Sequence, residues 1–239
     1  MAHRTLAQTA SESVRRMLTT PPSTWYSQWK QRDRRLPDTR AGYINLRATY
    51  SGEQLLVGGF EVMQAWERPL MRALAVEAAH SGGHVLEVGF GMGISASYLI
   101  EAGCSRYTVI EPHPAVLDRF RAWEQLQIVP VDAIEGFWED RIDQLGIFDG
   151  ILFDTYPVSE PEAHEKVYVP FISKASEHLR PGGVFTFYTG YADSLPAEHM
   201  QLLEKHFSNI HLYHVEGLIP PKDCQYFHHS RMLVPVCVK

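Results

Sequence analysis

Beyond Gly82, short apolar runs alternate with amphipathic segments along the chain. Parallel strands that are covered on both sheet faces are typically continuous apolar runs, and the segments between them form the covering helices. The pattern predicts strands at His84–Val88, Tyr107–Glu111, Gln127–Val131, Phe148–Phe153 and Val184–Tyr188. It predicts helices at Ile94–Ala102, Pro114–Glu124, Glu165–Leu179 and Ala197–Phe207. The sequence Pro181-Gly182-Gly183 is expected to form a turn before the fifth strand.

Two more β-like runs close the chain, Ile210–Val215 and Gln225–Val236, and the breaker-rich segment Gly217–Asp223 separates them. Their short connection predicts a hairpin at the edge of the sheet. The fold class expected from the whole pattern is therefore α/β, a doubly wound, mostly parallel, seven-stranded sheet of the Rossmann-like type.

The first part of the chain is more polar and less regular. Residues 1–52 are expected to form an N-terminal helical arm or lid, with one helical candidate at Ser11–Met17, and residues 53–239 the main domain. Between Glu53 and Ala79 apolar residues recur at helical spacing, with a break at Gly58-Gly59. Helices are therefore expected ahead of the first strand.

The composition narrows the function classes. A net charge of −6 argues against a nucleic-acid or acidic-membrane partner, because such surfaces select basic patches. Cys104, Cys224 and Cys237 show neither metal nor disulfide spacing, and no apolar run reaches the roughly 18 residues of a membrane span. No H-E-x-x-H motif occurs among the histidines, so no metal is expected. A cytoplasmic protein with a small-molecule ligand is expected.

A glycine-rich turn follows the first predicted strand, in the sequence Glu87-Val-Gly-Phe-Gly-Met-Gly93. Glycines let the backbone approach a ligand, and the N-terminus of the next helix offers free N–H groups to an anion. Glu111 follows about twenty residues later, where an acidic side chain binds ribose hydroxyls in nucleotide-binding sheets. A ligand with a nucleoside part is therefore expected at this turn.

The turn is compatible with more than one function. Gly91 to Ala96 also fits G-x-G-x-x-A with Glu111 at the distance of a dinucleotide site, so an NAD-dependent oxidoreductase stays open. Aminopropyl transfer on a similar sheet and a binding module without turnover stay open as well. The acid at Glu87, the C-terminal hairpin and the lack of a second catalytic domain favour S-adenosylmethionine.

Further motifs occur in a fixed order along the chain. They are Val62–Pro69, Val85–Met92, Gly136–Asp140, Phe148–Pro157, Leu179–Gly183 and Pro220–Tyr226. From about residue 54 to the C-terminus their order and spacing resemble the guanidinoacetate N-methyltransferase family. The resemblance implies a class I methyltransferase fold, with S-adenosylmethionine as methyl donor and S-adenosylhomocysteine as product.

The resemblance also implies a set of cofactor-binding residues, in which Glu111 binds the ribose and Glu139 lies near the adenine. The residues are Met63, Met71, Glu87, Gly89, Phe90, Gly91, Met92, Gly93, Ile94, Ser95, Glu111, Pro112, His113, Trp138 and Glu139.

For the substrate, the resemblance assigns a guanidinium to Glu67 and Asp154, with Tyr156 beside them. A guanidinium is planar, stays charged near neutral pH and has paired N–H donors, so two carboxylates can hold it in a fixed orientation. Its protonated form is a poor nucleophile. Asp154 is therefore expected to accept a proton from the attacking nitrogen while Glu67 orients the group.

The loop Phe187–Asp193 departs from the guanidinoacetate enzymes, whose backbone N–H groups there bind the substrate carboxylate. It is more similar to the related fungal arginine N-methyltransferases. Gly190 and Tyr191 are placed at the far end of the substrate. Guanidinoacetate and free L-arginine both remain candidate substrates.

Overall fold

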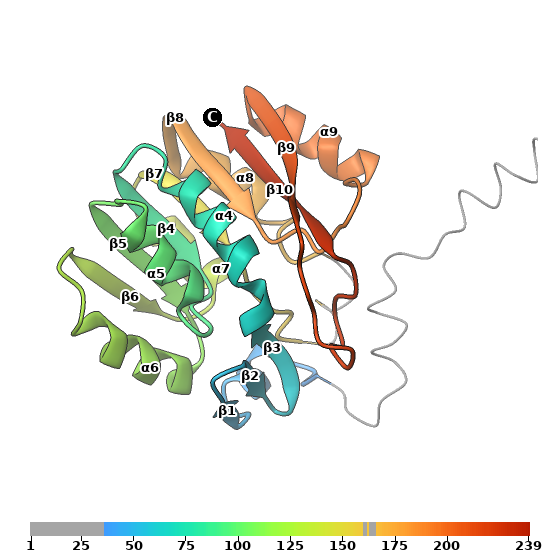
Figure 1. The fold of residues 1–239 in the computed structure, drawn as a ribbon. Coiled ribbons are helices and arrows are strands. Elements are labelled where there is room, and N and C mark those ends of the chain that lie inside the picture. Colours follow the sequence, from blue (N-terminus) through green and yellow to red (C-terminus); the bar gives the residue numbers. More distant parts are fainter. Residues whose placement is uncertain (1–35, 160–161, 163–165) are drawn as a thin grey trace, which may run out of the picture. The chain divides into compact units, whose positions relative to one another are not determined.

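The computed structural model describes residues 36–159, 162 and 166–239. These residues contain a seven-stranded sheet in the order β6-β5-β4-β7-β8-β10-β9 (Figure 1). The strands are β4 (His84–Val88), β5 (Arg106–Glu111), β6 (Val131–Glu135), β7 (Phe148–Phe153), β8 (Leu179–Phe187), β9 (Asn209–Glu216) and β10 (Arg231–Val238). Strands β6, β5, β4, β7 and β8 run parallel, whereas β10 pairs antiparallel with β8 and β9. The predicted doubly wound, mostly parallel sheet is confirmed.

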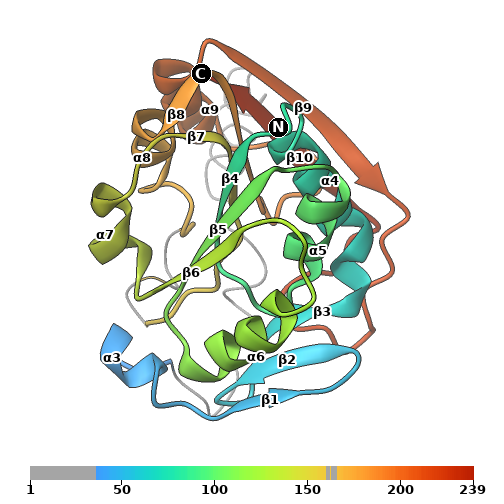
Figure 2. The ribbon, with the colours of Figure 1, turned by 90° about the vertical axis from the view of Figure 1, so that its left-hand side faces the viewer.

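Helices cover both faces of this sheet (Figures 1 and 2). One face carries α4 (Arg68–Ala78), α5 (Ile94–Glu101) and α6 (Pro114–Glu124), and the other carries α7 (Trp138–Arg141), α8 (Ile172–Glu177) and α9 (Ala197–His206). Each face has its own buried cluster. Leu74, Leu99 and Phe120 belong to the first. Ile172 and Leu203 belong to the second.

The helical prediction is wrong for residues 54–64. This stretch forms β2 (Gln54–Val57) and β3 (Phe60–Gln64), which with β1 (Ala48–Tyr50) make a small antiparallel sheet. Burial in β2 alternates residue by residue, which is the period of a strand. Gly58 and Gly59 have φ of 60° and 81° and form the two-residue hairpin turn between the strands, a signal that the sequence analysis took for a helix break. The helical prediction is correct from Arg68 onward, in α4.

Two strand boundaries also differ. β6 begins at Val131, where the predicted strand ends, because Ile128 is 97% exposed and lies in the connection from α6. β8 already begins at Leu179 and runs through Pro181-Gly182-Gly183, so these residues are not a turn ahead of the strand. The sheet register shifts there, since Phe148 pairs with Leu179 but Gly150 pairs with Val184.

The helix predicted at Glu165–Leu179 and the strand predicted at Gln225–Val236 are both shorter than expected. α8 begins at Ile172, two residues after Pro170. Proline has no backbone N–H to donate to the preceding turn, so a helix that starts earlier would be interrupted at Pro170. β10 begins at Arg231, and residues 225–230 form no strand.

The predicted arm falls largely outside the described residues, including its helical candidate at Ser11–Met17. The domain boundary between residues 52 and 53 stays a prediction. α3 (Arg40–Tyr43) is the first helix that the structure describes. In the described part of the chain, no helix is both long and apolar enough to cross a membrane.

The small sheet lies near the carboxyl ends of β4, β5 and β7 (Figure 2). Its contacts with these ends are specific. The Tyr50 hydroxyl donates to the Gly91 carbonyl oxygen at 3.1 Å, and His113 Nε2 lies 2.9 Å from the carbonyl oxygen of Leu46, just before β1. This is the edge where doubly wound sheets bind ligands.

Candidate active site

The glycine-rich turn follows β4 directly. Gly93 is the N-cap of α5 and has φ of 72°, a left-handed conformation that suits glycine. Gly89 has φ of 92°, and a Cβ there would lie 2.2 Å from the Asp154 carbonyl oxygen. The Asp154 N–H in turn donates to the Val88 carbonyl oxygen at 3.0 Å. The turn and Asp154 are therefore in backbone contact, and a side chain at Gly89 would separate them.

Glu111 anchors the other side of the turn. Its carboxylate accepts from the Phe90 N–H at 3.0 Å and from the His113 N–H at 2.8 Å. Burial raises its pKa to about 7, and these backbone hydrogen bonds oppose the rise. A carboxylate can accept about four hydrogen bonds. Glu111 therefore holds the turn in place and keeps acceptor capacity for a ribose, the role that the resemblance implies.

β3 lies against the same turn. The Met92 N–H donates to Met63 Sδ at 3.3 Å, so this thioether contacts the turn, and its role in cofactor binding stays a prediction. Met71 of α4 is fully buried in the core cluster. Ile94 and Pro112 follow the turn and Glu111 directly in the chain.

Two buried polar side chains lie beside the turn, Glu87 and Ser95. Glu87 lies at the end of β4, and its Oε2 accepts from the Tyr107 hydroxyl. Burial raises the pKa of Glu87 to about 8, and the Ser95 hydroxyl lowers it as a hydrogen-bond donor. A buried carboxyl with a raised pKa is stabilised by a cationic group beside it. An amino acid ammonium and carboxylate, as in S-adenosylmethionine, would fit these two side chains.

Glu67 and Asp154 come from different elements and lie close enough to repel each other. Glu67 ends the short helix η1 (Ala65–Glu67), and Asp154 follows β7. Burial raises the pKa of Glu67 to about 8, and the negative charge of Asp154 raises it further. Burial also raises the pKa of Asp154 to about 7. A cationic group would stabilise a buried and a half-buried carboxyl arranged in this way.

Contacts from distant parts of the chain fix the Glu67 side chain. Its Oε1 accepts from the Gln64 N–H at 2.7 Å and from the Tyr226 hydroxyl at 2.6 Å. The Trp66 and Phe227 rings stack with centroids 5.6 Å apart and 7° between planes. The segment after Asp223, predicted as a strand, thus positions Glu67.

The predicted adenine end is formed by α7 and the N-terminal segment. The Trp138 ring packs edge-on against Phe171, with centroids 5.1 Å apart, so part of it belongs to the core. Glu139 forms an ion pair with Arg40 of α3, and Arg40 Nε also donates to Glu162 at 2.9 Å. Arg40 therefore ties the segment before the small sheet to the residue predicted near the adenine.

The predicted far end of the substrate contains a lysine that the sequence analysis missed. Lys166 Nζ donates to the Thr189 carbonyl oxygen at 3.1 Å and lies 4.5 Å from the centroid of the Tyr191 ring. A Cβ at Gly190, whose φ is 67°, would lie 2.7 Å from the same Nζ. Burial lowers the pKa of Lys166 to about 8. Tyr156, which is also predicted to bind the substrate, is not part of this group of contacts. It lies near enough to Tyr43 to raise the pKa of Tyr43.

A sequence profile of the guanidinoacetate N-methyltransferase family matches residues 35–239. The chain belongs to this family. The resemblance drawn from the sequence motifs is confirmed, and with it the assignment to the class I methyltransferases, which use S-adenosylmethionine. At the level of the family, a methyl-transferring enzyme and S-adenosylmethionine as its cofactor are confirmed.

Curated relatives of this family member are named protein arginine N-methyltransferase 2. The one from Candida glabrata is 30% identical over 173 residues, which cover 67% of this chain and 40% of the relative. The one from Saccharomyces cerevisiae is 30% identical over 163 residues, which cover 62% of this chain and 38% of the relative. The chain thus spans about two fifths of the length of these relatives.

Solved structures share the fold. Spermidine synthase from Thermotoga maritima superposes with a TM-score of 0.57 at 14% identity, over 80% of this chain and 72% of that chain. The N-methyltransferase NodS from Bradyrhizobium japonicum WM9 has a TM-score of 0.51 at 17% identity, over 72% of this chain and 96% of that chain. At such identities the likeness supports the class I fold alone.

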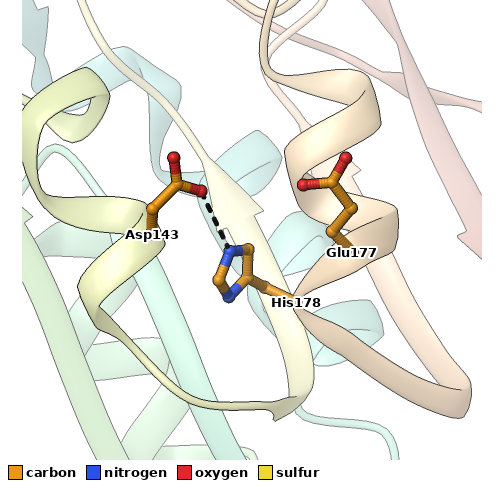
Figure 3. Close-up of side chains that lie close together, drawn as sticks. All are labelled: Asp143, Glu177 and His178. Atoms are coloured by element: carbon orange, nitrogen blue, oxygen red, sulfur yellow. Dashed lines mark ion pairs between the residues drawn. The ribbon is translucent and has the colours of Figure 1, made fainter.

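A group of possible metal ligands lies away from this site. Asp143, Glu177 and His178 have ligand atoms within 4.8 Å of one another (Figure 3). Lys174 Nζ donates to Asp143 at 2.6 Å and to Glu177 at 3.1 Å. The Phe148 N–H donates to the His178 carbonyl oxygen, so the group lies at the amino end of β7. An exposed ion-pair network accounts for it, at the opposite end of the strand from Asp154.

Proposed function

We propose that this protein transfers a methyl group from S-adenosylmethionine to a guanidino nitrogen of a small molecule, guanidinoacetate or free L-arginine. The observation that carries the proposal is the pair of the buried Glu67 and the half-buried Asp154, whose pKa values are raised to about 8 and about 7. A guanidinium placed between them would relieve both the burial cost and the mutual repulsion.

In this proposal the turn residues hold the methyl donor. Glu111 would bind the ribose hydroxyls, Glu87 and Ser95 would pair with the amino acid end, and Glu139 would lie near the adenine. Bound S-adenosylmethionine supplies an electrophilic methyl group on a sulfonium. The backbone contact of Gly89 with Asp154 supports the arrangement, because it brings the donor turn next to the guanidinium-binding acid.

Glu67 and Asp154 would divide the work on the acceptor. Glu67, fixed by Gln64 and Tyr226, holds the guanidinium plane. Asp154 accepts the proton that the nitrogen releases as its new N–C bond forms and its lone pair becomes available. Because burial raises the pKa of Asp154 to about 7, this carboxylate is a stronger base than an exposed aspartate.

The far end of the site supports a substrate with an anionic group. Lys166, which is half-buried, places its ammonium beside Gly190 and Tyr191. A carboxylate would pair with it, as in guanidinoacetate and free arginine. An arginine within a polypeptide has no such carboxylate, so we infer that free guanidino acids are preferred.

A substrate panel tests the proposal. Guanidinoacetate, L-arginine, agmatine and an arginine-containing peptide would each be incubated with S-adenosylmethionine, and S-adenosylhomocysteine release and product mass would be measured. Decarboxylated S-adenosylmethionine with a diamine tests for aminopropyl transfer. Methylation of a guanidino acid is expected. Methyl transfer to none of the four compounds would refute the proposed reaction.

Asp154→Asn is the decisive variant. Loss of the proton acceptor is expected to lower kcat at least about 100-fold, with affinity for S-adenosylmethionine unchanged within about twofold. Asp118→Asn is the matched control, because Asp118 is exposed on α6 and pairs with Arg121. Equal kcat values in the Asp154→Asn variant and the wild type would contradict the assigned role.

A further inference from the structure

Tyr188 lies beside the two acids. It follows β8, and its N–H donates to the Phe153 carbonyl oxygen at 3.0 Å, directly before Asp154 in the chain. Burial raises the pKa of Tyr188 well above its ordinary value, and the negative charges of Glu67 and Asp154 raise it further. The phenol therefore lies in the field of both carboxyls. Sequence analysis did not assign it a role.

The Tyr188 hydroxyl is buried and has no hydrogen-bond partner among the described residues. Three other tyrosine hydroxyls are paired, since Tyr226 donates to Glu67, Tyr107 donates to Glu87 and the Tyr168 hydroxyl lies 2.8 Å from His199 Nδ1. Leaving a buried hydroxyl unpaired costs free energy, and native proteins rarely do so without a functional reason. An unpaired hydroxyl beside two carboxyls indicates a partner that arrives with the substrate.

We propose that Tyr188 is a third substrate-binding residue, whose hydroxyl oxygen accepts a hydrogen bond from the guanidinium. The inference rests on the proposed function. A guanidinium has five N–H donors in one plane. Glu67 Oε1 already accepts two hydrogen bonds within the protein, which leaves its other oxygen and the Asp154 carboxylate for the guanidinium. The Tyr188 oxygen adds an acceptor within this cluster.

The substitution Tyr188→Phe separates this role from a structural one, because the two roles predict different changes in Tm and in KM. If the hydroxyl serves the substrate, its removal leaves the Tm of the free protein unchanged or raises it, and raises the KM for the guanidino substrate about tenfold. A structural hydroxyl would lower Tm and leave KM unchanged. Affinity for S-adenosylmethionine, measured by calorimetry, should stay within about twofold.

Tyr213→Phe is the matched control, since the Tyr213 hydroxyl donates to Glu77 at 3.0 Å outside this cluster. It should leave KM unchanged. An active wild type whose Tyr188→Phe variant keeps the wild-type KM would overturn the inference and leave the proposed function intact. If the wild type methylates nothing, calorimetry with guanidinoacetate and S-adenosylhomocysteine decides. Weaker binding by the variant supports the inference, and equal binding or none by either protein overturns it.

Discussion

The burial of Glu67 beside Asp154 predicts that Glu67→Gln changes stability with a sign that depends on pH. Glutamine keeps the shape of the side chain and removes the charge. The pKa of Glu67 rises from 4.5 to about 8 on folding, mainly through burial and then through Asp154. Because the folded-state pKa is raised, the folded protein binds the proton more tightly than the unfolded chain. Stability is therefore lost as pH rises from the unfolded to the folded pKa.

The magnitude follows from the size of the shift, at 1.36 kcal/mol per unit of pKa. Ionisation of Glu67 lowers the free energy of unfolding of the wild type by about 1 kcal/mol at pH 5, about 3 kcal/mol at pH 7 and about 5 kcal/mol at pH 9. Glutamine avoids this penalty but accepts weaker hydrogen bonds from Gln64 and Tyr226, which costs about 2 kcal/mol. The variant should thus be more stable than the wild type at pH 8.5 and equally or less stable at pH 5.

Thermal unfolding of the free protein at the two pH values measures this effect. For a chain of this size, about 2 kcal/mol corresponds to a Tm difference of roughly 5 °C. Glu67→Gln should therefore unfold about 5 °C above the wild type at pH 8.5 and not above it at pH 5. Glu101→Gln is the matched control, because Glu101 is exposed and pairs only at 3.5 Å with Arg72.

A Tm difference between Glu67→Gln and the wild type that is the same at both pH values would refute the reasoning. It would mean that Glu67 does not change its ionisation between the two conditions, and that the two acids do not form the charged, cation-binding pair on which the proposed function depends. The gain in stability should be accompanied by loss of methyl transfer, since the same charge is needed to hold the substrate.

Two further predictions concern the donor turn and the far end of the substrate. Gly89→Ala should weaken S-adenosylmethionine binding more than tenfold by calorimetry, because its Cβ would lie 2.2 Å from the Asp154 carbonyl oxygen, whereas Gly103→Ala, with a similar φ of 93° and no atom within 4 Å, should leave binding unchanged. Equal affinities for the two variants would contradict the close approach. Lys166→Met should raise the KM for guanidinoacetate and L-arginine about tenfold but not that for agmatine, which lacks the carboxylate. A parallel rise for all three would show that Lys166 does not bind that group.

The parallel core of the fold could be read from the sequence because its strands are buried on both faces. β4 and β7 have the bounds that their apolar runs predict. The residues of the edge strand β6 are half-buried or exposed, so no apolar run marks its ends. The predicted strand therefore lies ahead of the observed one. The small sheet was missed because β2 and β3 contain only a few residues each, too few to distinguish a period of two from the helical spacing.

Candidate site residues could be predicted from the sequence only where they lie in motifs of the family. Glu67 and Asp154 lie in segments that match the family, and the structure places them near each other from separate elements. Tyr188 and Lys166 carry no such signal. An isolated tyrosine at a strand end is usually a core residue, and an isolated lysine in an amphipathic segment is usually solvated. What distinguishes them is an unpaired hydroxyl and a half-buried ammonium, which appear only when distant segments are packed together.

The segment that was wrongly predicted as a strand shows why local pattern failed at this place. Residues 225–230 are rich in aromatic and polar side chains, as an edge strand is, yet their groups bind the region just before α4. The Gln225 N–H donates to Glu61 at 2.7 Å, and the Tyr226 hydroxyl donates to Glu67 at 2.6 Å. Extending β10 through this segment would fix its N–H groups in a ladder with β9. Residues 225–230 lack that regular pairing, and this segment instead holds the acid that orients the proposed substrate.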